Sequence, residues 1–264
     1  MILNPIFTTW GYFFRNINQS VILDYAQQIN SYNITVSNLE IDDKWESMYG
    51  DLDFDKTKFP DVKEMVDVLH KKYNMKCTLW VHPFCNIDSK EFVNGANNDI
   101  WVKNKYGKQP ALTEWWNGKH AAIIDTTNPN ALNYFYEKLE HLRSEYGIDA
   151  FKFDAGETSW IGPEFKLYNN SAKIDLYSQN YVKLAANLSN LIEVRTAQRT
   201  QNVGLFYRIL DRASDWTIHD GIKSVVTQTL QFSILGYPYV LPDIIGGNDG
   251  PDKSKKEVCF CFKI

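Results

Sequence analysis

The chain has 264 residues, 44% of them hydrophobic and 14% aromatic, a length close to the roughly 250 residues of a single α/β barrel. A formal net charge of −4 leaves no extended basic surface, which argues against nucleic acid or an anionic membrane as a partner. No apolar run reaches the roughly 18 residues that span a bilayer, and the four cysteines lack the spacing of a metal site or disulfide scaffold, so we expect free thiols.

Strand and helix patterns alternate along the chain, which is typical of βα units around a parallel sheet. In chain order, the expected strands are residues 7–12, 34–41, 76–82, 150–154, 191–196, 203–210 and 235–241. The expected helices are residues 21–29, 60–69, 132–142, 178–190 and 221–232. Ser20 is the expected cap of the first helix. The predicted fold class is therefore α/β, a TIM-type (β/α)8 barrel of which about seven strands are recognisable.

Two segments depart from the alternating pattern. Residues 83–128 have no regular pattern, and so long a loop in a compact domain is usually functional. Residues 251–264 form an atypical C-terminal tail, whose apolar end at 258–264 would supply an eighth strand if the barrel closes. We therefore expect a partial barrel over residues 1–250, followed by this tail.

The fourth strand ends on an acid. Phe151 and Phe153 alternate with Lys152 at the two-residue period of a strand, and Gly156 breaks the pattern just after Asp154. Asp154 is therefore held at the end of a buried strand, where its carboxylate either performs chemistry or caps the following turn. Lys152 points to the same side of the strand, and a lysine in an apolar core needs an anionic or polar partner.

Polar side chains gather at the C-terminal ends of the predicted strands. In a barrel of parallel strands these ends surround one mouth, where the active sites of this fold lie. We therefore expect a single site that includes Asp42, Asp43, Trp80, His82, Asp154, Arg195, Asp211 and Asp243.

The stretch around Asp154 resembles the nucleophile motif of glycoside hydrolase family 31, in which Trp, an aliphatic residue, Asp, Met, Asn and Glu follow one another. Asp154 and Glu157 keep this spacing, whereas Lys152 stands at the usual tryptophan and Ala155-Gly156 replace Met-Asn. This form is closest to the animal branch of myogenesis-regulating glycosidases, which is regarded as an α-galactosidase branch. Residues 235–247 also resemble the seventh barrel strand of the family.

The resemblance implies a retaining α-glycosidase with two catalytic carboxylates. Asp154 stands at the position of the nucleophile. Asp211 stands at the position of the general acid, because Ser214 and Trp216 follow it at the spacing of the family. One carboxylate would attack the anomeric carbon, and the other would protonate the leaving oxygen.

The assignment of the acid has alternatives. The usual Gly-Asp-Asn of the family is here Leu210-Asp211-Arg212, so Asp215 and Asp220 remain candidates for the role. Asp211 would instead be structural if it formed a salt bridge with Arg208 or with its neighbour Arg212.

Further residues at the mouth suit sugar binding. Arg195 matches the family arginine that contacts the sugar near the nucleophile, and Asp42 matches the aspartate that accepts hydrogen bonds from sugar hydroxyls. Lys152 is an expected donor to the 4-hydroxyl, whose orientation distinguishes galactose from glucose. His82 either lines the pocket or satisfies a buried backbone group. The expected substrate-binding residues are Asp42, Asp43, Trp80, Trp116, Lys152, Arg195 and Asp243. The two tryptophans offer flat surfaces on which pyranose rings stack.

The expected function is hydrolysis of O-glycosidic bonds in an oligosaccharide or glycan, with α-galactosides as the preferred substrates. The alternatives are an α-glucosidase or α-xylosidase, or an inactive sugar-binding protein that keeps the pocket. We expect no metal or organic cofactor, because no His or Cys residues cluster with the acids. The resemblance suggests the secretory pathway, such as the endoplasmic reticulum lumen, or an extracellular location.

Overall fold

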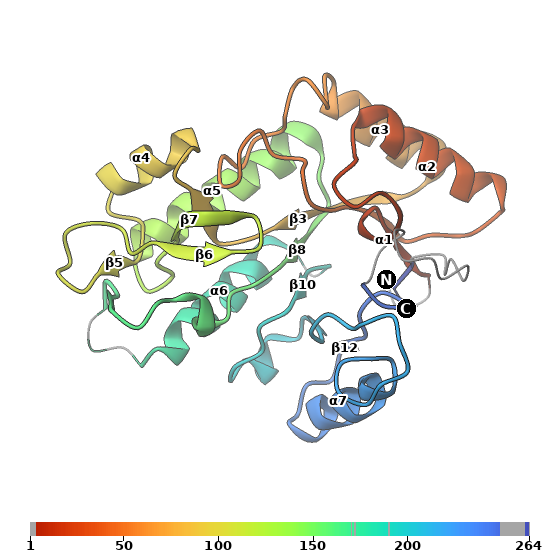
Figure 1. Ribbon diagram of the computed structural model, residues 1–264. Coiled ribbons are helices and arrows are strands. Elements are labelled where there is room, and N and C mark those ends of the chain that lie inside the picture. The colour runs from red at the N-terminus through yellow and green to blue at the C-terminus, as the bar shows by residue number, and fades with distance from the viewer. Residues whose placement is uncertain (1–3, 170, 172, 190, 249–261, 264) are drawn as a thin grey trace.

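Seven parallel strands form the centre of the computed structural model, which describes residues 4–169, 171, 173–189, 191–248 and 262–263. They follow one another across the sheet in chain order, and each neighbouring pair is parallel (Figure 1). They are β1 (Ile6–Thr8), β2 (Asn38–Ile41), β3 (Lys76–Val81), β8 (Ala150–Phe153), β10 (Glu193–Val194), β11 (Phe206–Arg208) and β12 (Val240–Leu241). The predicted barrel class and its seven strands are confirmed.

The longer helices form an outer layer on this sheet. They are α2 (Gln19–Ser31), α3 (Val62–Tyr73), α5 (Pro129–Tyr146), α6 (Asp175–Leu188) and α7 (Lys223–Ile234). In this layer α2 packs against α3, α3 against α5, and α5 against α6. Each of these four helices buries the apolar stripe that its sequence spacing predicts, as Ile22, Ala26 and Ile29 do in α2.

The sheet of described residues is not closed into a full barrel. β12 pairs only with β11, and on the far side β13 (Phe262–Lys263) pairs antiparallel with β1. The rest of the predicted tail, residues 251–261 and 264, lies outside the described residues. In α7, Val226, Leu230 and Ile234 are more than half exposed, so this helix shows an apolar stripe to solvent. No helix in the described part of the chain is both long and apolar enough to cross a bilayer.

The structure corrects two details at the N-terminus. The first strand ends at Thr8 rather than at residue 12, because the chain turns there into the short helix α1 (Trp10–Phe13). Thr8 Oγ1 accepts a hydrogen bond from the Trp10 backbone N–H at 3.2 Å, a local bond that competes with continued strand pairing. Asn18 caps α2 through Val21 N at 3.0 Å, whereas the predicted cap Ser20 only donates to Asn18.

The prediction that residues 83–128 are irregular is wrong. This connection contains helix α4 (Lys90–Asn97) and a three-stranded antiparallel sheet of β4 (Phe84–Asn86), β6 (Thr113–Trp115) and β7 (Gly118–Ile123). A further short strand, β5 (Lys103–Asn104), pairs with β9 (Phe165–Lys166) after β8. Strands of two to six residues are too short to show a clear alternation in sequence, which is why the pattern missed them. Two 3-10 helices complete the fold, η1 (Thr158–Trp160) and η2 (Gln201–Val203).

Candidate active site

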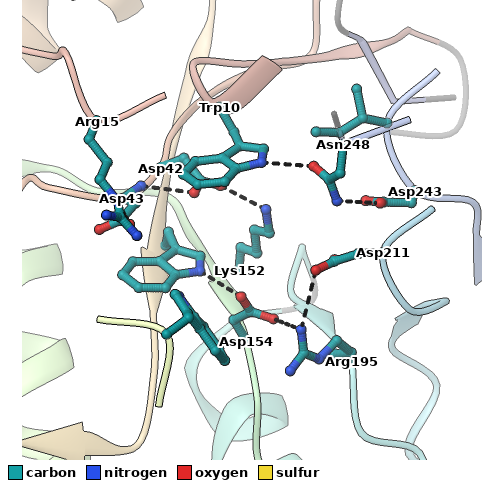
Figure 2. A pocket seen from close by; sticks show the side chains of 13 residues that line it. Trp10, Arg15, Asp42, Asp43, Lys152, Asp154, Arg195, Asp211, Asp243 and Asn248 are labelled. Atoms are coloured by element: carbon teal, nitrogen blue, oxygen red, sulfur yellow. Dashed lines mark hydrogen bonds and ion pairs between the residues drawn. The ribbon is translucent and has the colours of Figure 1, made fainter. Parts of the chain in front are cut away.

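A cavity of about 360 Å³ opens at the C-terminal ends of the barrel strands (Figure 2). Its lining contains every residue predicted to be catalytic or to bind substrate: Asp42, Asp43, Trp80, Trp116, Lys152, Asp154, Arg195, Asp211 and Asp243. They come together because parallel strands all end at the same edge of the sheet. Trp116 comes instead from the turn between β6 and β7, in the connection predicted to be functional.

Asp154 lies at the base of the cavity and is only 8% exposed. Its Oδ2 accepts a hydrogen bond from the Trp80 indole N–H at 2.9 Å. Its Oδ1 contacts two guanidinium groups, Arg208 at 2.9 Å and Arg195 at 3.1 Å. The carboxylate is therefore fixed from both sides and does not serve mainly as a cap of the following turn.

The charges around Asp154 keep it ionised. Burial alone would raise the pKa of this carboxyl, but Arg195, Arg208 and Lys152 outweigh burial and hold the pKa well below its usual range. The hydrogen bond from Trp80 acts in the same direction. At neutral pH the group is thus an anion, the form that a carboxylate nucleophile requires.

Asp211 contacts the same two arginines. Its Oδ1 lies 2.8 Å from Arg208 Nη1, and its Oδ2 lies 3.9 Å from the Arg195 Nη1 that also touches Asp154. Burial and the nearby Asp154 raise the pKa of Asp211, but Arg208 and Arg195 lower it to below its usual value. Because the side chain is 58% exposed, water weakens these effects. The predicted alternative of a salt bridge with Arg208 is therefore present in the structure.

The other two candidate acids lie elsewhere. Asp215 Oδ1 accepts hydrogen bonds from the backbone N–H and hydroxyl of Thr217, and Asp220 lies 3.3 Å from the same hydroxyl. Neither aspartate lines the cavity. Of the three candidates, only Asp211 is in a position to meet a substrate bound beside Asp154.

Glu157, the last residue of the nucleophile motif, holds Arg195 in place. Its Oε1 lies 2.6 Å from Arg195 Nε and its Oε2 lies 3.3 Å from Arg195 Nη2. The Trp160 indole N–H donates to the same carboxylate at 2.9 Å. The guanidinium is thereby fixed with its remaining nitrogen directed at Asp154. These contacts give a physical reason for the spacing of Asp154 and Glu157 in the motif.

Lys152 has two buried anionic partners, as its position in the strand required. Its Nζ lies 2.7 Å from Asp42 Oδ2 and 3.2 Å from Glu40 Oε1. One cation therefore faces two carboxylates in a site nearly closed to water. Burial, together with the nearby Glu40, outweighs the lowering effect of Lys152 and raises the pKa of Asp42 to about 7.

This raised pKa predicts a pH dependence of stability. The folded protein holds the Asp42 proton up to about 7, whereas the unfolded chain releases it near 3.8. Stability from this group is therefore complete below pH 3.8 and is lost as the pH rises to about 7. The Asp42→Asn variant has no such proton to lose, so its stability relative to the wild type should improve over that range in urea unfolding. The control is Asp24→Asn, which changes an exposed aspartate on α2. If the difference in unfolding free energy between Asp42→Asn and the wild type does not change with pH, the prediction is contradicted.

Asp43 is committed to other protein groups. Tyr49 donates its hydroxyl to Oδ1 at 2.7 Å, while Arg15 Nε and Asn117 Nδ2 each lie 2.9 Å from Oδ2. Arg15 also donates to Asn117 Oδ1. Asp43 therefore serves to tie the turn after β6 to the segment after α1, which leaves little capacity for the predicted contact with sugar.

Of the aromatic and histidine residues predicted at the site, Trp116 is exposed at the cavity, whereas Trp80 and His82 are buried. Trp80 is only 2% exposed and uses its indole N–H on Asp154, so it presents little ring surface for stacking. Trp116 is 39% exposed, with Arg195 5.5 Å from the ring centroid. His82 does not line the cavity. It lies 2.9 Å from Glu46 and accepts from Phe84 N, the buried structural role that was one of its two predicted alternatives.

Several residues of the site were not predicted to belong to it, and Arg208 was expected only as a possible partner of Asp211. Arg208, at the end of β11, contacts Asp154, Asp211, Asp243 and Glu193, and it is fully buried below the cavity. An arginine within a predicted core strand was the available signal. The other residues that were missed line the cavity itself: Trp10, Arg15, Ile244 and Asn248. Asn248 links Trp10 at 2.7 Å to Asp243 at 2.8 Å, a contact between chain ends that no local pattern indicates.

Within the residues that the structure describes, no group of three or more His, Cys, Asp or Glu side chains is placed to hold a metal ion. The acids of the cavity are paired instead with arginine and lysine. The cavity offers the fixed carboxylate of Asp154 and the second carboxyl group of Asp211 beside Arg195 and Arg208.

Comparison with known proteins places the chain among carbohydrate-active relatives. Residues 5–261 match the model described as "Glycosyl hydrolases family 31 TIM-barrel domain". The chain is 39% identical over 251 residues to the myogenesis-regulating glycosidase of Mus musculus. This match covers 95% of this chain and 35% of the mouse protein. It is 26% identical over 160 residues to alpha-xylosidase A of Aspergillus niger, over 60% of this chain and 21% of that protein. The chain thus spans about a third of the length of the mouse relative.

Solved structures share the fold. The GH31 dextranase FjDex31A of Flavobacterium johnsoniae, complexed with glucose, superposes with a TM-score of 0.79 at 18% identity, over 93% of this chain and 32% of that one. A GH31 α-xylosidase from a soil metagenome, complexed with xylose, gives a TM-score of 0.78 at 19% identity, over 93% of this chain and 36% of that one. At such identities the likeness supports the barrel fold alone.

Proposed function

Because this chain belongs to glycoside hydrolase family 31, we propose that its cavity hydrolyses α-glycosidic bonds with retention of configuration and that α-galactosides are its preferred substrates. One observation carries the proposal. Asp154 and Asp211 follow different strands yet contact the same Arg195 nitrogen, at 3.1 Å and 3.9 Å, in one cavity. A pair of carboxyl groups facing one sugar site is what glycoside hydrolysis by double displacement needs.

In the proposed reaction Asp154 attacks the anomeric carbon and forms a covalent glycosyl ester, while Asp211 gives a proton to the leaving oxygen. Asp211 then removes a proton from water, which attacks the same carbon and releases Asp154. Trp80, Arg195 and Arg208 hold the attacking carboxylate in one orientation before the sugar enters. Such preorganisation lowers the barrier because little rearrangement is left for the reaction itself.

Asp211 must carry a proton to act as the acid, and its arginine partners oppose this. A bound substrate that separates Asp211 from Arg208 would raise its pKa and allow the transfer. If the ion pair persists, the pocket binds sugar without cleaving it. The contact of 2.8 Å between Arg208 and Asp211 is the observation that favours this second candidate function, a sugar-binding protein.

Turnover and binding should be measured separately. Release of nitrophenol from the aryl α-galactoside, α-glucoside and α-xyloside tests hydrolysis, and calorimetry with methyl α-galactoside tests binding. We expect both activity and binding, with the α-galactoside as the best substrate. Binding without turnover would support the sugar-binding candidate. If the protein neither binds nor hydrolyses these sugars, both candidate functions are refuted.

Lys152 is the residue that we expect to select galactose. Its ammonium is held by Asp42 and Glu40 and lines the cavity, so it can donate to the axial 4-hydroxyl. A buried donor that loses its acceptor costs about 1 to 3 kcal/mol, roughly a tenfold to hundredfold preference. Lys152→Ala should therefore lower the kcat/KM for the α-galactoside relative to the kcat/KM for the α-glucoside about tenfold to hundredfold.

The control for this prediction is Lys173→Ala, which removes an exposed lysine outside the cavity and should leave the ratio unchanged. Lys152→Ala also leaves two buried carboxylates without their cation, so its folding must be checked by circular dichroism. An unchanged ratio in a folded variant would remove Lys152 from sugar selection. Equal or better kcat/KM on the α-glucoside in the wild type would instead favour the α-glucosidase alternative.

A further inference from the structure

A second cavity, of about 310 Å³, is separate from the candidate active site, and the two linings share no residue. It forms where two segments far apart in the sequence meet. β5, in the long connection after β3, pairs antiparallel with β9, which follows β8 (Figure 1). Nothing in the proposed hydrolysis uses this cavity.

Two tyrosines of the second cavity present their rings to solvent. Tyr106 is 68% exposed and Tyr168 is 64% exposed. The backbone around both is held by specific hydrogen bonds: Tyr106 N donates to Asn104 at 3.1 Å, and Tyr168 N donates to the buried Asp125 at 2.6 Å. The rings are thus large apolar surfaces on an ordered frame, which is the arrangement found where an aromatic ring stacks on a ligand.

Gly107 lies where the two segments meet, in a turn with a positive φ. The Lys166 side chain passes 3.4 Å from the place where a Cβ would be at Gly107, and the glycine has a φ of 71°. A residue with a side chain would be strained in this backbone conformation. The cavity is therefore built by the turn after β5 and by β9 together.

The charges of the lining balance. Lys103 pairs with Asp99 at 2.8 Å, and Asp125 accepts hydrogen bonds from Tyr168 N and Thr127. With Lys166 the lining holds two lysines and two aspartates. Such a site does not select strongly for an anion or a cation. The ligand chemistry that suits exposed rings beside balanced polar groups is a neutral molecule with both hydroxyl groups and apolar faces.

We propose that this second cavity binds a neutral oligosaccharide. The rings of Tyr106 and Tyr168 stack on pyranose faces, while Lys103, Lys166 and Asp99 form hydrogen bonds with the hydroxyl groups. The site goes beyond the proposed hydrolysis, because it binds sugar whether or not the first cavity turns it over.

Two tryptophans report on the two cavities independently. Trp101 lines the second cavity and donates its indole N–H to Phe92 O at 2.9 Å, whereas Trp80 lines the first and donates to Asp154. The whole chain, labelled with ¹⁵N-tryptophan, is titrated with maltotetraose, with stachyose and with methyl α-galactoside. We expect the two oligosaccharides to shift the Trp101 indole signal in a saturable way. In the Tyr106→Ala/Tyr168→Ala variant the affinity measured at Trp101 should fall at least about tenfold.

The same variant should leave the response of Trp80 to methyl α-galactoside unchanged, which separates this site from the first cavity. Tyr32→Ala, which truncates a tyrosine that is 67% exposed at the end of α2, is the matched control and should bind like the wild type. The proposal is refuted if neither oligosaccharide shifts Trp101, or if the double variant binds as tightly as the wild type. A shift caused by trigalacturonate but by neither neutral sugar would refute the neutral ligand class.

Discussion

Replacing Asp154 with asparagine is expected to lower kcat on an aryl α-galactoside by at least about a thousandfold. The amide has nearly the shape of the carboxylate, but it cannot attack the anomeric carbon. Its carbonyl oxygen can still accept the Trp80 indole N–H, so the affinity for methyl α-galactoside should change much less than kcat. The measurement is steady-state kinetics beside calorimetric binding. Asp215→Asn, which alters an aspartate outside the cavity, is the control.

A second variant tests the role of the carboxylate more directly. In Asp154→Gly, the space between Trp80, Arg195 and Arg208 lacks an anion but keeps its cations. Azide can enter there and attack the anomeric carbon of an activated aryl glycoside, displacing the aryl oxide. A nucleophile role predicts a β-glycosyl azide as the product. Wild-type rates in Asp154→Asn, or an α-glycosyl azide from Asp154→Gly, would exclude Asp154 as the nucleophile.

Of the variants proposed here, Arg208→Met should lose the most stability, about 3 to 5 kcal/mol in the free energy of unfolding. The guanidinium is 2% exposed and lies between four carboxylates: Asp211 at 2.8 Å, Asp154 at 2.9 Å, Glu193 at 3.0 Å and Asp243 at 3.2 Å. The contact with Glu193 is close but poorly directed for a hydrogen bond, so charge is its main contribution. Without the arginine, three largely buried carboxylates lose a cation.

Urea unfolding of the two proteins measures this loss. Arg199→Met is the control, because that side chain is 66% exposed and has one long ion pair of 3.8 Å, so the change should stay below about 1 kcal/mol. Adding Glu193→Gln to Arg208→Met should restore part of the stability, because it neutralises one of the buried carboxylates that faced the Arg208 cation. A loss in Arg208→Met no larger than the loss in the control would show that the network is not important for folding.

The arginine network also bears on whether the protein turns substrate over. Arg195 and Arg208 favour the anionic form of Asp154, which a nucleophile needs, but they favour the same form of Asp211, which an acid does not. The difference between the two carboxyl groups is exposure, because the Asp154 side chain is 11% exposed while the Asp211 side chain is 58% exposed. An exposed carboxylate can leave its arginine partners at a low cost when a substrate enters. The kinetic and binding experiments on the wild type decide whether the protein hydrolyses its sugar ligand or only binds it.

Much of the molecule is readable from local patterns in the sequence. The apolar stripes of α2, α3 and α5 and the alternation around Phe151 and Phe153 follow from helix and strand periods, which depend only on nearby residues. The cavity lining was largely predictable for a related reason. Once seven parallel strands are recognised, their ends must lie together, so Asp42, Asp154 and Asp211 had to meet.

Partners that are distant in sequence were decided by the tertiary structure alone. The pairing of Asp43 with Arg15, the link from Trp10 to Asn248, and the second cavity between β5 and β9 depend on how segments fold over one another. Such contacts produce no helix or strand periodicity in the sequence, because each of these residue types is equally compatible with an exposed loop. The sequence by itself therefore determined the seven strands of the barrel and the acids at their ends, but not the short strands of the connections. Only the tertiary structure decided which cation holds each acid, because the electrostatic energy of a pair depends on distance and burial rather than on position along the chain.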